Sequence, residues 1–196
     1  MKKGERTRDH ILAKSAAVFN QHGYAASSMS DLMLATKLKK GGIYNHFASK
    51  EQLALEAFDY AVALIQTRFD ALLEGRILAS ERLKAVIEVY LEFIHDPVLP
   101  GGCPVLNAAI ESDDSNENLR QRTRLVVTGW KTRIQGMIEM GIAKGELKAG
   151  TDAAKLSTIM LATLEGAVMM SKVCRDATHM RTAASFLEDH LQSLKV

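Results

Sequence analysis

The sequence is poor in the residues that build disulfide-linked, sheet-rich or membrane-spanning proteins. Its 196 residues include two cysteines, Cys103 and Cys174, too few for a disulfide scaffold or a four-cysteine zinc site. Three prolines and 6% aromatic residues favour helices over sheets. No run of about 18 uncharged apolar residues occurs, and no apolar segment follows the charged N-terminus. We therefore expect a helical, cytoplasmic protein without a membrane span or a signal peptide.

The formal net charge of +2 conceals an uneven distribution. Residues 1–50 contain nine basic and three acidic side chains, a balance of +6, so the rest of the chain carries −4. A basic segment on an acidic body is typical of a protein in which one small region contacts a polyanion. The alternative is a chance fluctuation of surface charge.

Apolar periodicity predicts an all-α protein of nine helices and no strand. The predicted helices span residues 6–22, 28–36, 40–47, 49–73, 80–95, 105–111, 118–143, 151–173 and 177–194. Pro97, Pro100 and Pro104 lie within eight residues, together with Gly101 and Gly102. This cluster predicts the main irregular connection, because proline and glycine both interrupt helices.

Two short helices joined by a tight turn, after a longer helix, form a helix-turn-helix pattern in the first fifty residues. Gly41 and Gly42 cost the second short helix about 1 kcal/mol each relative to alanine, but they let the backbone approach DNA closely. Lysines can neutralise phosphates, and an asparagine amide can pair with an adenine edge. The residues predicted for DNA contact on these grounds are Lys39, Lys40, Tyr44, Asn45, His46 and, at a helix start, Lys50.

Three short motifs in residues 6–53 resemble the N-terminal domain of TetR-type bacterial transcriptional regulators. They are Gly23-Tyr24, Ser28-x-x-Asp31-Leu32 and Ile43-Tyr44-x-His46-Phe47-x-Ser49-Lys50. The resemblance implies a homodimeric repressor that binds a palindromic operator through a three-helix domain, residues 1–50. It also implies that residues 51–196 bind a small ligand, which releases the DNA, and dimerise. By position it implies DNA contacts at Ser28, Lys40, Gly42, Tyr44, Asn45, His46 and Lys50.

The sequence departs from this family at Lys37, where a turn glycine is usual. The position favours φ > 0, which strains a residue other than glycine. Two points are open: whether the turn is re-formed locally, and whether Lys37 adds a phosphate contact.

The last two predicted helices carry the pattern expected of a subunit interface. Apolar residues in the last helix are spaced 4-3-4, which indicates a seam between helices, and the preceding helix is apolar nearly all round. A four-helix contact between two subunits would cover both helices, and packing within one chain is the alternative. The residues predicted for the interface are Leu164, Met180, Ala184, Leu187 and Leu191.

The long central helices supply the candidate pocket for a small apolar, aromatic or electrophilic effector. Glu165 lies in an apolar helix and needs a partner, which we expect to be Arg124, Arg133 or a cationic or hydroxylated ligand. A methionine stripe at helical spacing also suits an ordinary core. The predicted lining residues are Tyr90, Phe93, Cys103, Asn107, Trp130, Met137, Leu161, Glu165 and Met169.

Cys103 suggests a second mode of regulation. It stands at a predicted helix start, where backbone N–H groups favour a reactive thiolate. A similar Gly-Cys segment occurs in a subgroup of TetR-like repressors that includes electrophile sensors. The alternatives are a thiol-based sensor acting through Cys103 and a buried, inert thiol.

Enzymatic and purely structural functions have little support in the sequence. Glu92-x-x-His95 is one half of a di-iron motif, and a second half is missing. Phosphate-binding glycine loops, zinc-protease motifs and nucleophile elbows are absent from the sequence. We expect no metal and no cofactor. A helical protein that acts only through protein partners would not need the DNA-binding motif.

Overall fold

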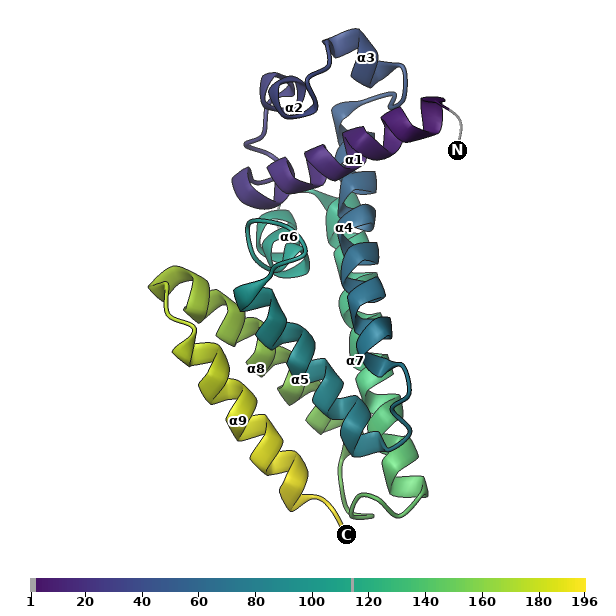
Figure 1. Cartoon of the computed structure of the whole chain (residues 1–196), viewed down its shortest axis with the longest axis vertical. Helices are drawn as coiled ribbons and strands as arrows, with labels where there is room; N and C mark the ends of the chain where they lie inside the picture. Colours follow the sequence, from purple (N-terminus) through teal and green to yellow (C-terminus); the bar gives the residue numbers. More distant parts are fainter. Residues whose placement is uncertain (1–2, 114) are drawn as a thin grey trace. The chain divides into compact units, whose positions relative to one another are not determined.

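The structure is a computed structural model that describes residues 3–113 and 115–196. These residues form nine α-helices, and their strand-like pairing is limited to one bridge between Leu147 and Lys195 (Figure 1). The all-α prediction is confirmed. The helices are α1 (Lys3–His22), α2 (Met29–Thr36), α3 (Lys40–Tyr44), α4 (Lys50–Leu73), α5 (Ala79–His95), α6 (Pro104–Ser112), α7 (Glu117–Ala143), α8 (Ala153–Cys174) and α9 (Thr178–Ser193).

Local capping explains where the helices begin and end. Gly23 follows α1 with φ +91°, and its N–H donates to Phe19 O at 2.8 Å, so glycine ends the helix as predicted. Ser49 Oγ accepts from Gln52 N at 3.0 Å at the start of α4. Of the two predicted caps for α8, the Asp152 carboxylate is the one that accepts, from Lys155 N.

One helix is shorter than its sequence pattern suggested. We expected a helix over residues 40–47, whereas α3 ends at Tyr44 and the chain continues through a turn at Asn45 and His46. His46 N donates to Ile43 O at 2.9 Å, a bond that tightens the end of the helix. A five-residue helix with two glycines has too little intrinsic propensity to extend further.

The chain divides into two compact units. The first comprises the described parts of residues 1–65 and 98–126, and the second comprises residues 66–97 and 127–196. The predicted boundary at residue 50 stays a prediction for the DNA-binding domain; the compact unit that contains those residues also includes α6 and parts of α4 and α7.

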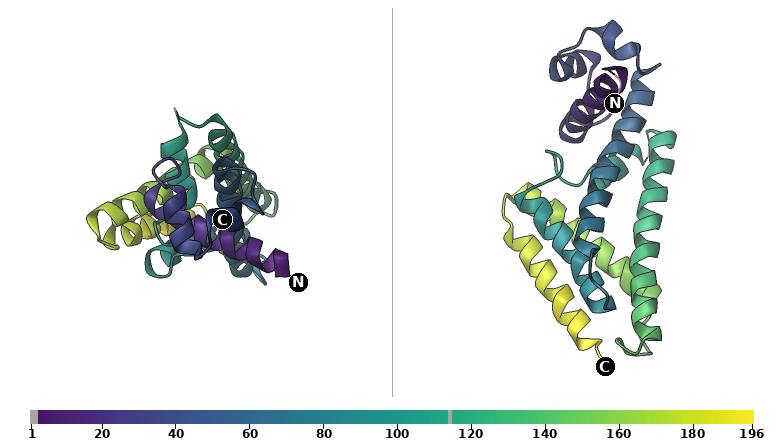
Figure 2. Two further views of the ribbon diagram at one scale, coloured as in Figure 1. Left: turned by 90° about the horizontal axis from the view of Figure 1, so that it is seen from above. Right: turned by 45° about the vertical axis from the view of Figure 1, so that its right-hand side comes forward.

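In the first unit, α1 packs against α2, and α2 against α3 (Figure 2). Large apolar side chains from these helices and from the start of α4 fill its core. Those at most 1% exposed include Ile11, Phe19, Leu32, Ile43, Phe47, Leu53 and Phe58.

In the second unit, α8 lies along α9, and both pack against α5 (Figure 1). The five residues predicted to join two subunits are buried inside this single chain: Leu164, Met180, Ala184, Leu187 and Leu191 are each at most 5% exposed. A side chain that is already covered cannot contribute area to a subunit interface. Within the single chain the seam pattern therefore describes helix packing, and the intersubunit contact of these residues stays a prediction.

By length and composition, α8 is the one helix of the described residues that could cross a membrane. Core helices of soluble proteins pass the same test, and 44% of its most apolar window is buried by the rest of the chain. The other side of α8 is exposed and apolar.

The glycine-rich connection before α6 is held by amide side chains. Asn20 Nδ2 donates to the carbonyls of Pro100 and Gly102, both at 2.9 Å. Asn107 Nδ2 donates to Asn20 Oδ1 at 2.9 Å and to Gly101 O at 3.0 Å. These bonds join α1 and α6 within the first unit.

This close packing predicts a large effect for Gly101→Ala. The new Cβ would lie 2.4 Å from Asn20 O, in a residue whose φ is +110°. We expect a loss of at least about 3 kcal/mol in the free energy of unfolding, measured by urea denaturation. Gly75→Ala is the control: its φ is +75° but nothing lies within 4 Å of the new Cβ, so only about 1 kcal/mol should be lost. Equal losses would contradict the packing described above.

Candidate nucleic-acid interface

The turn between α2 and α3 keeps a left-handed residue although glycine is missing. Lys37 has φ 58° and ψ 29°, so the turn is not re-formed. His10 Nε2 donates to Thr36 O at 2.9 Å, and Thr36 Oγ1 donates to Leu32 O at 2.7 Å. These contacts hold the end of α2 while the left-handed lysine costs about 1 kcal/mol or more relative to glycine.

A reciprocal cap starts α2. Ser28 N and Ser28 Oγ each donate to Asp31 Oδ2 at 2.7 Å, and Asp31 N donates back to Ser28 Oγ at 3.2 Å. The hydrogen bonds from Ser28 lower the pKa of the Asp31 carboxyl below its ordinary value. Because the Ser28 hydroxyl proton is engaged, this side chain can donate to a phosphate only after releasing Asp31.

The two glycines of α3 are not required by the packing of the fold. Ile43 is the buried residue of this helix. A Cβ at Gly41 would meet nothing within 4 Å, and one at Gly42 would meet only Leu38, at an ordinary 3.6 Å. Neither glycine has a positive φ. The missing side chains therefore leave room on the outside of the helix.

Most of the predicted DNA-binding residues lie on α3 or in the segments that flank it, and Ser28 caps the start of α2. Lys39 precedes the helix without a side-chain cap, and the Lys40 ammonium lies 5.7 Å from the centre of the Tyr44 ring. Of the remaining residues, Asn45 and His46 follow α3 in the turn, and Lys50 begins α4, where its Nζ donates to Ala25 O at 3.3 Å. The exposed members are Ser28, Lys39, Lys40, Tyr44 and Asn45, and the half-buried ones are Gly42, His46 and Lys50.

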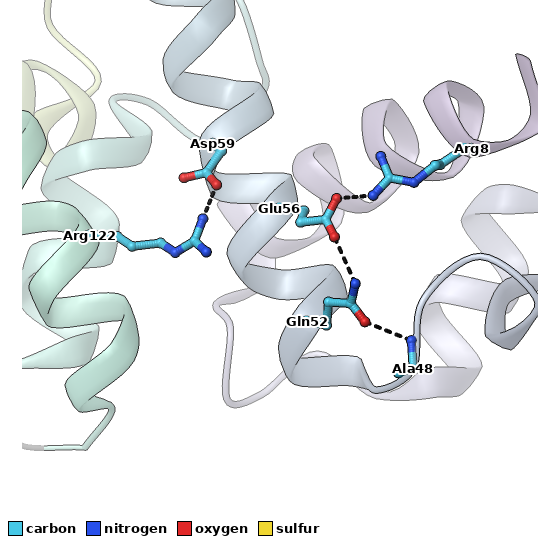
Figure 3. Close-up of polar contacts among 6 residues, drawn as sticks. All are labelled: Arg8, Ala48, Gln52, Glu56, Asp59 and Arg122. Carbon is cyan, nitrogen blue, oxygen red and sulfur yellow. Dashed lines mark hydrogen bonds and ion pairs between the residues drawn. The ribbon is translucent and has the colours of Figure 1, made fainter. Parts of the chain in front are cut away.

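A chain of polar contacts that sequence reasoning missed supports this surface (Figure 3). Arg8 of α1 forms an ion pair with Glu56 of α4, and its guanidinium lies 4.8 Å from the centre of the Phe47 ring. Gln52 Nε2 donates to Glu56 Oε1 at 2.9 Å, and Gln52 Oε1 accepts from Ala48 N at 2.8 Å. These contacts fasten the segment after α3 to α1 and α4.

On the other side of α4, Asp59 pairs with Arg122 of α7 (Figure 3). Both ion pairs join residues more than 45 positions apart, which no local pattern reveals.

Glu111 is a further residue that the sequence analysis did not single out. Its carboxylate accepts from Tyr24 N at 2.7 Å and from Ala25 N at 2.5 Å, in the turn between α1 and α2. The Tyr24 ring stacks on Phe19 at 5.2 Å. Burial, with a smaller contribution from the Glu111 charge, raises the pKa of the Tyr24 phenol above its ordinary value. Glu111 thus holds the backbone that leads into the helix-turn-helix.

The predicted effector residues fall into both units. In the second unit the Tyr90 hydroxyl donates to Glu165 Oε1 at 2.7 Å, and Tyr90 lies edge-on to Phe93 at 5.6 Å. Met137 and Leu161 are buried there and Trp130 is half-buried. Met169, 46% exposed, faces outward and does not line an interior pocket in the single chain.

The two remaining effector candidates, Cys103 and Asn107, lie in the first unit. Cys103 precedes α6 and is 1% exposed, while the Asn107 amide is engaged with α1 and the glycine connection. Arg133, a predicted partner for Glu165, donates to Asp70 at 2.6 Å.

The described residues contain no group of three or more His, Cys, Asp or Glu side chains placed to hold a metal ion.

Comparison with known proteins defines the class of this helix-turn-helix protein. Residues 11–57 match the family of bacterial regulatory proteins called the tetR family, and residues 79–187 match the tetracyclin repressor-like C-terminal domain. The chain therefore belongs to the TetR family of DNA-binding transcriptional repressors, which pair a helix-turn-helix with a ligand-binding domain.

The whole chain is similar to solved members. A TetR transcriptional regulator from Chloroflexus aurantiacus is 44% identical, with a TM-score of 0.96 over 100% of this chain and 98% of that one. A TetR-family regulator from Cytophaga hutchinsonii is 33% identical, with a TM-score of 0.91 over the same shares. The HTH-type transcriptional repressor DhaR of a Mycobacterium species is 24% identical over 169 residues, 86% of this chain and 84% of that protein.

The Ser28–Asp31 cap predicts a dependence of stability on pH. The lowered pKa of Asp31 means that its contribution is present above the unfolded pKa, near 4, and is lost as the pH falls through the folded value. Asp31→Asn should therefore lower the melting temperature at pH 7, and its curve should converge with the parent's once the pH has fallen through the folded pKa of Asp31. Asp9→Asn, at an exposed position of α1, is the control for the change of charge. The cap is contradicted if both variants follow the parent at every pH.

Proposed function

We propose that this repressor acts as a homodimer that binds a palindromic operator and is released by a small effector. The exposed surface of α3 and its flanking turns carries the proposal. Lys40 and two glycines lie on this short helix, Lys39 precedes it and the Asn45 amide follows it, and the packing of the fold does not require either glycine. Two such surfaces related by two-fold symmetry would read two half-sites about one helical turn of DNA apart.

We assign the contacts by chemistry. Lys39, Lys40 and Lys50 neutralise phosphates, while Tyr44 and His46 donate to phosphate oxygens. Asn45 reads an adenine edge in the major groove through its amide. Gly42 lets the helix approach the duplex closely, and the α2 start at Ser28 faces a phosphate.

The exposed side of α8 and α9 suits a second copy of this chain. It carries large apolar side chains that the single chain leaves uncovered: Ile159, Met169, Met170 and Val173 on α8, and Phe186 on α9, between 42% and 78% exposed. Exposed apolar groups on neighbouring helices are costly in water and are typical of a protein contact. These residues replace the buried seam in the proposed interface.

The effector is proposed to bind in the second unit. The Tyr90–Glu165 pair places a hydroxyl and a carboxylate beside Phe93, a combination that suits an apolar or aromatic molecule carrying a hydrogen-bonding group. Release of DNA requires that the effector bind more tightly to a state of the dimer whose two recognition helices no longer fit one duplex. Sensing through Cys103 stays an alternative, which needs a motion that exposes this buried thiol. We expect the protein to work in the cytoplasm without enzymatic activity.

Substitution of Asn45 tests DNA reading. Asn45→Ala should weaken binding to the DNA upstream of this protein's own gene by about 5- to 160-fold, since one base contact is worth about 1–3 kcal/mol. Binding to random DNA should change little. Lys50→Ala should weaken both, because a phosphate contact carries no sequence information. Gel shifts at several salt concentrations measure all six affinities, those of the parent and the two variants for each DNA. A parent chain that binds upstream DNA no more tightly than random DNA would refute the proposed operator.

A second prediction concerns the dimer. Val173→Glu combined with Phe186→Glu should convert the dimer to a folded monomer in light scattering, because the two carboxylates would be buried in the interface. Ile77→Glu, at an exposed apolar position away from α8 and α9 in sequence, should leave the mass unchanged. A double variant that stays dimeric would show that the interface lies elsewhere.

A further inference from the structure

We propose that Lys37, the left-handed residue of the turn, is a DNA-binding residue in its own right. The inference rests on the proposed function and adds a phosphate contact at a position where glycine would serve the fold better. Three lysines, Lys37, Lys39 and Lys40, then form one phosphate-binding group, here called the turn cluster.

Each of the two lysines that flank Leu38 stands where another residue would be more stable. Lys37 adopts φ 58°, which glycine adopts without strain. Lys39 occupies the cap position of α3, but an ammonium group has no acceptor for a helix N–H, and no side-chain cap bond forms. At both positions, the residue that is locally less stable places a positive charge in the same turn.

The fold gives these charges no anionic partner among the described residues. Lys37, Lys39 and Lys40 are exposed, and none takes part in the ion pairs of the described chain. Ammonium groups this close in sequence also repel one another. A polyanion outside the chain would relieve this repulsion, and its attraction to the three ammonium groups would offset the strain at Lys37 and the missing cap at Lys39.

The competing explanation is that Lys37 only stabilises the end of α2. A positive charge is favourable at a helix C-terminus. The chain offers a control for this effect, because Arg175 stands at the end of α8 with φ 53° and ψ 37°. Lys37 and Arg175 are the two residues other than glycine with positive φ in the described part of the chain. Both are basic, exposed helix caps, but Arg175 lies in the second unit.

The test compares Lys37→Gly with Arg175→Gly. Both variants relieve a left-handed residue and remove one helix-terminal charge, so their melting temperatures should shift alike. Their affinities for a random-sequence duplex are then measured between 50 and 200 mM KCl. Lys37→Gly should make the slope of log K against log salt less negative by about 0.9 per subunit. Over this range, the parent should then lose about 3.5-fold more affinity per subunit than Lys37→Gly.

Lys37→Arg completes the set, because it keeps both the charge and the strain and should keep the parent slope. A Lys37→Gly slope equal to that of Arg175→Gly would overturn the proposal, as would a loss of affinity without a change of slope, which indicates a structural role. A parent chain that binds no DNA at all would contradict the proposed function, and this outcome is distinct from an unchanged slope.

Discussion

The left-handed turn between α2 and α3 is the constraint on which the DNA-binding surface depends. It sets the direction in which α3 leaves α2, and Leu32, Ile43 and Phe47 anchor the two helices and the segment that follows in one core. His10 fixes the end of α2 from α1. Only with this geometry do Lys40, Tyr44 and Asn45 share one exposed surface. The surrounding packing, and not the turn itself, therefore offsets the energetic cost of a left-handed lysine.

In the first unit, long-range polar contacts hold the segments that flank the helix-turn-helix. Glu111 binds the backbone before α2, and Gln52 binds the backbone before α4. The carboxylate that holds the earlier segment comes from α6, which directly follows the glycine connection from α5. The helix α5, which packs on α8 and α9, belongs to the proposed effector region. From α5 the chain runs through the glycine connection and α6 to Glu111, which holds the turn before α2. The backbone thus connects the proposed effector region with the proposed DNA-binding surface.

Sequence reasoning succeeded where the signal was local. Helix boundaries followed from Gly23, Ser49, Asp152 and the proline cluster. The short motif around α3 placed the candidate DNA contacts, which stay a prediction. Sequence reasoning could not decide where one pattern fits two structures. The 4-3-4 spacing of α9 describes packing against any helix, and only burial shows that Leu187 and Leu191 face the same chain. It was silent on Glu111 and Arg8, whose partners are 87 and 48 positions away. The predicted end of α3 was wrong because a helix of five residues is too short to show a helical period in the sequence.

Hydroxyl-radical footprinting of the upstream DNA is the most direct test of the central claim, that two copies of the α3 surface read one symmetric site. The account predicts two protected patches of similar strength, related by two-fold symmetry and separated by about one helical turn, roughly 10 base pairs. Protection of a single patch, or protection spread evenly along the duplex, would contradict it.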